Sequence, residues 1–348
     1  MRITYRETVL LVLCVAALLV VWVSGYPKST HTPVQRDLAA EEARWGARIA
    51  AVGGVAAYTE LAREVEPETP QERHAQAHYF GGALYDTEGV ESVSVCDAQF
   101  SYGCFHEFLG RAIAENGLPS VADLNQKCFD RLDEQGLACQ HGIGHGLVSY
   151  LGYDQKDLVR ALEVCRDLPH GDPIGGCFGG VFMEFNMRTL ASENGLRPGF
   201  AEDPTEPCSA LRSPYQQPCL YWQPQWWYQS QHEAGVGVQD AFFRIGELCR
   251  SFNDASLLRA CFEGTGNIVP PSVEFSEKRS AEVCDYMAQT PTERTYCRAV
   301  AANSFFNGGA GKRGDSLVVC AGLEGPYHEY CVAYAENRFN VLIPGILP

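Results

Sequence analysis

The sequence predicts an all-α fold in which disulfide-stapled α/α hairpins form a solenoid-like repeat array after an N-terminal transmembrane helix. Three observations lead to this prediction: cysteines that recur in couples, helical periodicity between the couples, and an uncharged apolar stretch near residue 10. No stretch of comparable length alternates polar and apolar residues as a half-buried strand would. Because 46% of the 348 residues are apolar, a packed structure is expected.

The apolar stretch covers residues 8–27, which carry no charge. A helix that spans a bilayer needs about 20 such residues, and Arg2 and Arg6 in front of them favour a cytoplasmic N-terminus. We therefore interpret residues 1–25 as a signal anchor and place the bulk of the chain outside the cytoplasm, in the periplasm or the extracellular space. A cleaved signal peptide is the alternative interpretation. Residues 26–36, with two prolines, are predicted to be a linker.

The charge balance argues against one class of partner, and the missing sequence motifs argue against one class of cofactor. Lys and Arg number 27 against 43 Asp and Glu, the net charge is -16, and no basic block interrupts the acidity. A nucleic-acid partner is therefore not expected. No P-loop and no dinucleotide-binding glycine motif in a βαβ context occurs, so no nucleotide cofactor is expected either. The partners that remain are the membrane, through the N-terminal helix, and a protein or peptide.

Fifteen cysteines are many for a chain of this length. Apart from Cys14 in the apolar stretch, they form seven couples, and none of them has the CxxC spacing of zinc ribbons or redox sites. Disulfide bonds are the expected state, which places this part of the chain in an oxidising compartment. The couples are Cys96 and Cys104, Cys128 and Cys139, Cys165 and Cys177, Cys208 and Cys219, Cys249 and Cys261, Cys284 and Cys297, and Cys320 and Cys331.

The couples recur at a nearly constant period. Their first members advance from residue 96 to residue 320 in six steps of about 37 residues. Such a period is typical of stacked helical hairpins, which bury their apolar faces only against neighbouring repeats. Pairing within each couple uses all fourteen cysteines, whereas pairing across each hairpin leaves Cys96 and Cys331 without partners. We therefore favour local pairing, in which each short loop contributes about 2–3 kcal/mol to stability.

Helical periodicity fills the segments before and between the couples. Residues 37–95 predict three helices that form an N-terminal cap, and residues 96–348 contain the cysteine-coupled repeats. The helix after the second cysteine of a couple often ends in Asn-Gly, as at residues 116–117 and 194–195. Glycine suits the left-handed residue that closes a helix. A return helix then leads to the next cysteine.

A group of histidines is the strongest candidate for chemistry. His106 and His141 both lie two residues beyond the second cysteine of a couple, so neighbouring repeats should bring them side by side. His141 and His145, like His74 and His78, are four residues apart, which puts each pair on one helical face. Neutral imidazoles bind zinc, copper or iron, and a carboxylate can complete such a site. We predict a transition metal such as zinc, with ligands drawn from His78, His106, His141, His145, Glu107 and Glu184.

The alternative interpretation of these residues is structural. A histidine near the start of a helix can hydrogen-bond a neighbouring carbonyl, and the glycines around His141 and His145 can let helices pack closely. Three His-Glu pairs occur in the chain, but none continues to the HExxH motif of zinc proteases. The sequence therefore assigns no catalytic residue and leaves open whether the protein is an enzyme.

A second candidate is an aromatic cluster in residues 220–235. The large side chains gathered around Pro224 can grip a peptide, a sugar or a partner protein. The alternative is that they fill the core of an irregular middle repeat. The candidate binding residues are Tyr221, Trp222, Trp226 and Trp227.

The cysteine-coupled hairpins of residues 96–340 resemble secreted cysteine-rich helical repeat proteins of the Sel1 and tetratricopeptide type. This resemblance implies a curved α/α solenoid used for binding, and it transfers no catalytic residues. The expected function is therefore that of a membrane-anchored extracytoplasmic binding or scaffold module. The alternative is a metal-binding protein or a metal-dependent enzyme with a histidine cluster in the N-terminal repeats.

Overall fold

The computed structural model describes residues 38–132, 136–190, 195–199, 203–306 and 313–338. The chain divides into two units, Met1–Ala40 and Glu41–Pro348, and the fold described below is that of the second. All regular elements in the described residues are helices, as the sequence predicts. None of these helices is long and apolar enough to cross a membrane. The predicted anchor and linker, residues 1–36, lie outside the described part of the chain.

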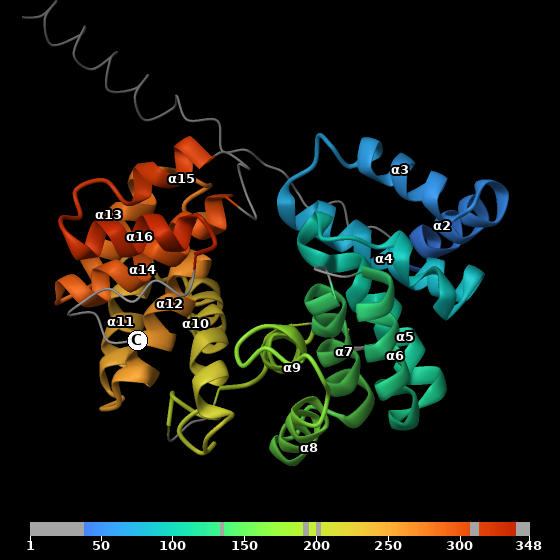
Figure 1. Ribbon diagram of the computed structural model, residues 1–348, viewed down its shortest axis with the longest axis horizontal. Helices are drawn as coiled ribbons and strands as arrows, with labels where there is room; N and C mark the ends of the chain where they lie inside the picture. Colours follow the sequence, from blue (N-terminus) through green and yellow to red (C-terminus); the bar gives the residue numbers. More distant parts are fainter. Residues whose placement is uncertain (1–37, 133–135, 191–194, 200–202, 307–312, 339–348) are drawn as a thin grey trace, which may run out of the picture. The chain divides into compact units, whose positions relative to one another are not determined.

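The elements are best given in chain order, with the labels of Figure 1. They are α2 (Leu38–Val52), α3 (Gly54–Glu64), α4 (Pro70–Glu88), η1 (Val90–Val95), η2 (Gln99–Tyr102), α5 (Gly103–Asn116), η3 (Leu118–Ser120), α6 (Val121–Leu132), α7 (Gly136–Leu151), α8 (Gln155–Arg166), α9 (Gly176–Met187), α10 (Gln216–Glu233), α11 (Val238–Arg250), α12 (Ala255–Ser272), α13 (Glu277–Met287), α14 (Pro291–Ser304), α15 (Arg313–Val319) and α16 (Pro326–Ala335).

The three helices predicted ahead of the first couple are α2, α3 and α4. The break between α2 and α3 falls at Gly53, whose φ of 83° is accessible to glycine and strained for other residues. Helix α4 begins with a complete capping box, in which Thr69 and Glu72 satisfy each other's backbone N–H groups and Pro70 occupies the first turn. Local sequence signals are thus sufficient to place the starts and ends of these helices.

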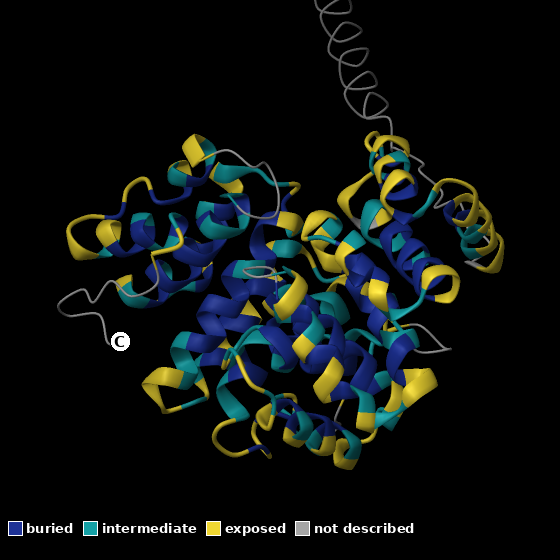
Figure 2. Ribbon diagram, turned by 45° about the vertical axis from the view of Figure 1, so that its right-hand side comes forward, coloured by how far each residue is buried: buried dark blue, intermediate teal, exposed yellow. Residues whose placement is uncertain are grey.

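The repeats form two sets of helices. The helix that carries the second cysteine of a couple packs against its counterpart in the next repeat, and we call these, with α4, the A helices. They are α4, α5, α7, α9, α10, α12, α14 and α16. The return helices, which we call the B helices, each pack on A helices of their own or the next repeat, and they are α6, α8, α11, α13 and α15. Buried residues concentrate along the A helices, whereas exposed residues lie mostly on α2, α3, the B helices and the turns (Figure 2).

Local disulfide pairing is confirmed for all seven couples, with Cα–Cα distances of 5.4–5.7 Å. In the second couple, for example, the bond joins Cys128 near the end of α6 to Cys139 in the first turn of α7. Each bond therefore ties the end of one repeat to the A helix of the next. Bonds of this kind are consistent with a location outside the cytoplasm.

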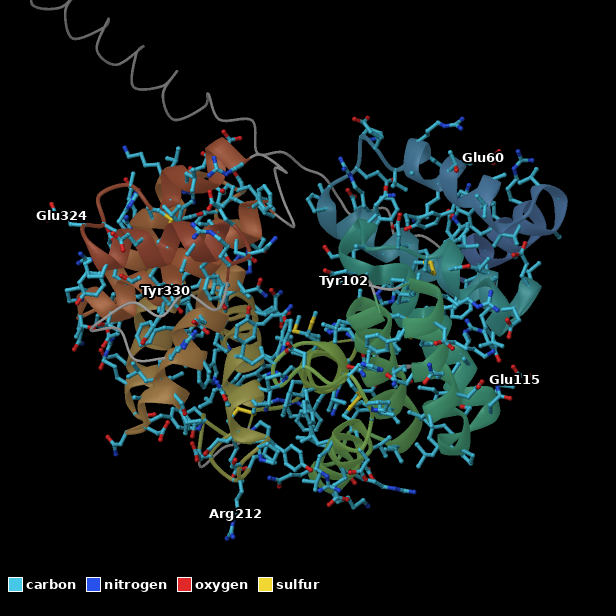
Figure 3. The ribbon with its side chains drawn as sticks, in the orientation of Figure 1. Glu60, Tyr102, Glu115, Arg212, Glu324 and Tyr330 are labelled. Atoms are coloured by element: carbon cyan, nitrogen blue, oxygen red, sulfur yellow. A yellow bond between two sulfur atoms is a disulfide. The ribbon has the colours of Figure 1, made fainter. Side chains whose placement is uncertain are left out.

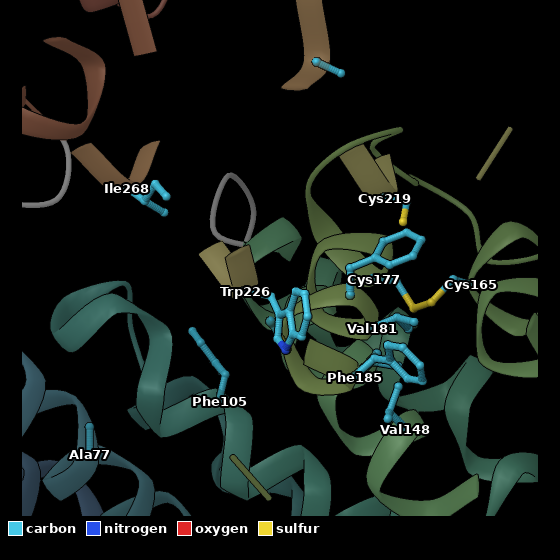
Figure 4. Close-up of a cluster of buried hydrophobic side chains, with 14 of the residues drawn as sticks. Ala77, Phe105, Val148, Cys165, Cys177, Val181, Phe185, Cys219, Trp226 and Ile268 are labelled. Carbon is cyan, nitrogen blue, oxygen red and sulfur yellow. A yellow bond between two sulfur atoms is a disulfide. The ribbon is translucent and has the colours of Figure 1, made fainter. Parts of the chain in front are cut away.

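The repeat that begins with α9 departs from the others. The helix predicted to reach residues 194–195 ends at Met187, because Arg188 adopts a left-handed conformation with φ 51°. Between residues 188 and 215 the described part of the chain contains no α-helix. The apolar face of α9, including Val181 and Phe185, packs in the core with Val148 (Figure 4). The early end of α9 matters for the site, because it turns the following residues back toward Glu184.

Candidate metal centre

Five histidines from three consecutive A helices come together. His74 and His78 lie on α4, His106 on α5, and His141 and His145 on α7. Two groups of ligand atoms result, each with its atoms within 4.8 Å of one another. We call His74, His78 and His106 the α4–α5 triad, and His106, His141 and His145 the α5–α7 triad; His106 belongs to both. The four predicted histidines, His78, His106, His141 and His145, therefore lie together in the structure.

The α4–α5 triad has the spacing of metal ligands. Nε2 of His78 lies 3.1 Å from Nε2 of His74 and 3.1 Å from Nδ1 of His106. The three rings stand nearly perpendicular to one another, at interplanar angles of 69–78°. Two imidazole nitrogens bound to a tetrahedral zinc at about 2.0–2.1 Å lie roughly 3.3–3.4 Å apart. The nitrogens are thus already close to the positions that one ion requires.

The α5–α7 triad lies deeper. Nε2 of His141 is 3.2 Å from Nε2 of His145, and the ring of His106 stacks on that of His145 with centroids 4.0 Å apart. His106 and His145 are each 1% exposed and His141 is 8% exposed. Two aromatic rings flank His141, namely Tyr102, labelled in Figure 3, and Trp222. Polar nitrogens this deeply buried need partners to offset their lost hydration.

Hydrogen bonds fix which nitrogens are free to bind. The carbonyl oxygen of Phe100 lies 2.7 Å from Nδ1 of His74, and a carboxylate oxygen of Glu184 lies 2.9 Å from Nδ1 of His145. Both oxygens only accept, so these Nδ1 atoms carry the protons. His141 hydrogen-bonds the backbone of Gly176, and its Nδ1 faces the first turn of α9. The opposite nitrogens then present bare lone pairs.

The consequence is a repulsive pair at the centre of the α5–α7 triad. With both Nδ1 atoms protonated, Nε2 of His141 and Nε2 of His145 direct lone pairs at each other across 3.2 Å. Only a cation between them, a proton or a metal ion, turns this repulsion into attraction. In most metal-binding histidines, the ring nitrogen that does not bind the metal donates a hydrogen bond to a carboxylate or a carbonyl oxygen.

Glu184 anchors this arrangement from α9. Its carboxylate accepts hydrogen bonds from His145, from the Tyr153 hydroxyl at 2.6 Å, from the Thr189 hydroxyl and from the Leu190 backbone N–H at 2.9 Å. Burial raises the pKa of Glu184, but the hydrogen bonds from His145, Thr189 and Tyr153 outweigh burial and hold that pKa below its usual value. The carboxylate is therefore ionised at neutral pH, and its negative charge is buried beside His145.

The imidazoles are held in the form that binds metal. Burial lowers the pKa of His78, His106 and His141 well below the ordinary value, and the neighbouring histidines lower it further. Burial also lowers the pKa of His74, against the effect of its bond to the Phe100 carbonyl. These four rings are thus neutral at neutral pH, which keeps a lone pair available on each.

The two predicted carboxylates, Glu107 and Glu184, have different partners in the structure. Neither triad in the described residues contains Glu107 or Glu184, but Glu184 hydrogen-bonds His145 directly. Glu107 follows His106 by one position, about 100° around the helix, and accepts a hydrogen bond at 2.9 Å from Arg111, which also pairs with Glu42. Burial raises the pKa of Glu107, although Arg111 opposes this effect. Glu107 therefore belongs to an ion-pair network beside the triads.

Sequence reasoning did not include His74 among the ligands. The signal was present, because His74 precedes His78, a predicted ligand, by four residues on the same helical face. Tyr153 and Thr189, which orient Glu184, carry no sequence signal of this kind.

The predicted aromatic cluster lies on one helix, α10, which continues through Pro224. Trp226 and Trp227 are buried, whereas Tyr221 and Trp222 are half-buried. The indole N–H groups of Trp222, Trp226 and Trp227 donate to the backbone carbonyl oxygens of Ile174, Arg197 and Pro204, respectively. These carbonyls lie in the segments on either side of α9. These bonds tie α10 to the irregular repeat, which favours the packing interpretation for Trp226 and Trp227. The half-buried pair leaves an aromatic surface next to His141.

No family model, curated protein or solved structure matches the chain. What can be stated is the class that the fold defines: a disulfide-stapled, all-helical protein whose A helices stack from repeat to repeat. The resemblance to Sel1 and tetratricopeptide repeats stays a prediction. The arrangement of the five histidines is therefore the main indication of function.

Proposed function

We propose that the protein binds a divalent transition metal ion at the α5–α7 triad. The observation that carries this proposal is the pair of facing Nε2 atoms of His141 and His145, 3.2 Å apart, each on a ring whose other nitrogen is engaged. An all-imidazole donor set suits zinc, copper, iron or nickel better than magnesium or calcium. Glu184 supplies the buried negative charge that partly neutralises the ion.

The setting of this function is a membrane-tethered repeat protein outside the cytoplasm. The uncharged residues 8–27 have the length of a membrane span and support a tether. The seven disulfides support an oxidising compartment. In such a compartment a structural or catalytic metal is acquired from the surroundings, and a pre-organised set of ligands raises affinity because little ordering remains to be done on binding.

Metal analysis of the full chain tests this proposal. The protein is purified without a histidine tag and with its disulfides intact, stripped with a chelator, incubated with zinc and dialysed. We expect the wild-type chain to retain zinc stoichiometrically and the triple variant His106→Gln/His141→Gln/His145→Gln to lose it. The matched control is His232→Gln/His328→Gln, since both side chains are exposed and lie outside the cluster. A wild-type chain without retained zinc, copper or iron would contradict the proposal.

A second prediction concerns Glu184. The Glu184→Gln variant keeps the size of the side chain but removes its charge and weakens the hold on Nδ1 of His145. Loss of a carboxylate that orients a metal-bound histidine usually lowers affinity about 10–100-fold, and we expect a zinc dissociation constant raised by this factor. Competition with a chromophoric chelator measures it. Glu263→Gln is the control, because Glu263 is equally buried but pairs with Arg259 and Tyr330.

A further inference from the structure

His106 belongs to both triads, whereas the proposed single ion occupies only the α5–α7 triad. Its Nδ1 faces His78 at 3.1 Å in the α4–α5 triad. Its Nε2 is buried and has no hydrogen-bond partner among the described residues. The side chain is only 1% exposed, so solvent does not satisfy this atom. A buried polar nitrogen of this kind is costly and indicates that something else binds it.

The geometry of imidazole limits what one ion can do here. The two ring nitrogens direct their lone pairs away from each other in the ring plane, so a single ion uses only one of them. When Nδ1 of His106 binds an ion together with His74 and His78, the neutral ring carries its proton on Nε2. That N–H group then has no acceptor in the described part of the chain. When Nε2 instead binds the ion at the α5–α7 triad, Nδ1 carries the proton and donates it to Nε2 of His78. No proton then lies between Nε2 of His78 and Nε2 of His74, 3.1 Å apart, so their lone pairs repel. Two ions, one on each nitrogen of His106, remove both conflicts.

We propose that the cluster binds two divalent transition metal ions bridged by the imidazolate of His106. This inference depends on the proposed function and extends it. Nδ1 of His106 joins His74 and His78 on one ion, and Nε2 joins His141 and His145 on the other. Each ion accepts lone pairs from three nitrogens. The N–H bond of His106 breaks and its proton leaves to solvent, and no oxidation state changes.

Two further features fit a two-ion centre. The ring of His106 lies 4.0 Å from that of His145 and 5.0 Å from that of His78, centroid to centroid, so it contacts ligands of both triads. Because the rings of His106 and His145 are nearly parallel, at 15°, one of them rotates about its Cβ–Cγ bond when both Nε2 atoms bind the same ion. At opposite ends of the cluster, Nδ1 of His74 donates to the carbonyl oxygen of Phe100 and Nδ1 of His145 donates to the carboxylate of Glu184. The carboxylate and the imidazolate together offset half of the positive charge of the two ions.

Copper loading of the full chain distinguishes one bound ion per chain from two. The stripped protein, free of any tag and with intact disulfides, is titrated with Cu(II) and examined by elemental analysis and electron paramagnetic resonance. We expect two copper ions per chain and a signal far below two spins, because an imidazolate bridge couples them antiferromagnetically. The variants His74→Gln/His78→Gln and His141→Gln/His145→Gln should each retain one copper with the full signal of one uncoupled spin.

The outcomes are distinct. One copper per wild-type chain, or two with uncoupled spins, overturns the bridged centre while leaving the proposed function intact. No bound copper or zinc overturns both. The His106→Gln variant tests the bridge directly, because it should remove the coupling. The exposed-histidine variant His232→Gln/His328→Gln should match the wild type in copper count and coupling, and circular dichroism of every variant confirms that its helices are retained.

Discussion

The Gly180→Ala variant is expected to lose about 3 kcal/mol of unfolding free energy, at the upper end of the usual cost of overpacking a core. A Cβ atom at position 180 would lie 1.9 Å from the backbone carbonyl oxygen of His141 and 3.0 Å from the backbone nitrogen of His145. Backbone atoms cannot rotate away as a side chain can, so α7 and α9 must move apart. The better helix propensity of alanine, worth about 1 kcal/mol, does not compensate. Urea unfolding monitored by circular dichroism measures the change.

The same variant should weaken metal binding, because the displaced helix α7 carries His141 and His145. Gly264→Ala provides a matched control, since its Cβ would lie 1.9 Å from the carbonyl oxygen of Tyr221. Both glycines lie three residues beyond the second cysteine of a couple. We expect a similar loss of stability from Gly264→Ala with unchanged zinc affinity. A Gly180→Ala protein as stable as the wild type would show that α7 and α9 are not this close.

Removal of the second disulfide, by Cys128→Ala/Cys139→Ala, is expected to lower the unfolding free energy by about 2–3 kcal/mol. The bond closes a loop with a sequence separation of 11 and ties the end of α6 to the start of α7. Without it the unfolded chain gains conformational freedom, and α7 loses a restraint two residues before His141. Stability from urea unfolding and zinc affinity from chelator competition are measured on the same samples.

The last disulfide supplies the comparison. Cys320 and Cys331 also have a separation of 11, but α16 packs against α14 and α15, which carry none of the five histidines. Cys320→Ala/Cys331→Ala should therefore lose a similar amount of stability and keep the zinc affinity of the wild type. If both double variants bind zinc equally well, the second disulfide has no part in positioning the histidines.

The sequence was sufficient for the features that depend on local chemistry. Gly53, the Thr69 capping box and Gly117 place helix ends through backbone conformation and hydrogen bonds within a few residues. Cysteine parity and the short separations within couples determined the disulfide pairing, since local loops close most readily. The constant period then brought His106 and His141 into register, because equivalent positions of stacked repeats are neighbours.

Only the tertiary structure decided which residues join the predicted histidines at the site. Whether a side chain reaches the histidines depends on the rotation of each helix about its axis, which the repeat period does not specify: Glu107 turns toward Arg111, whereas Glu184 turns toward His145. The early end of α9 at Arg188 brings Thr189 and Leu190 onto Glu184, and the cap brings in His74. The contact between Glu184 and His145 joins residues 39 positions apart, so it depends on how α7 and α9 pack and is not encoded in either segment.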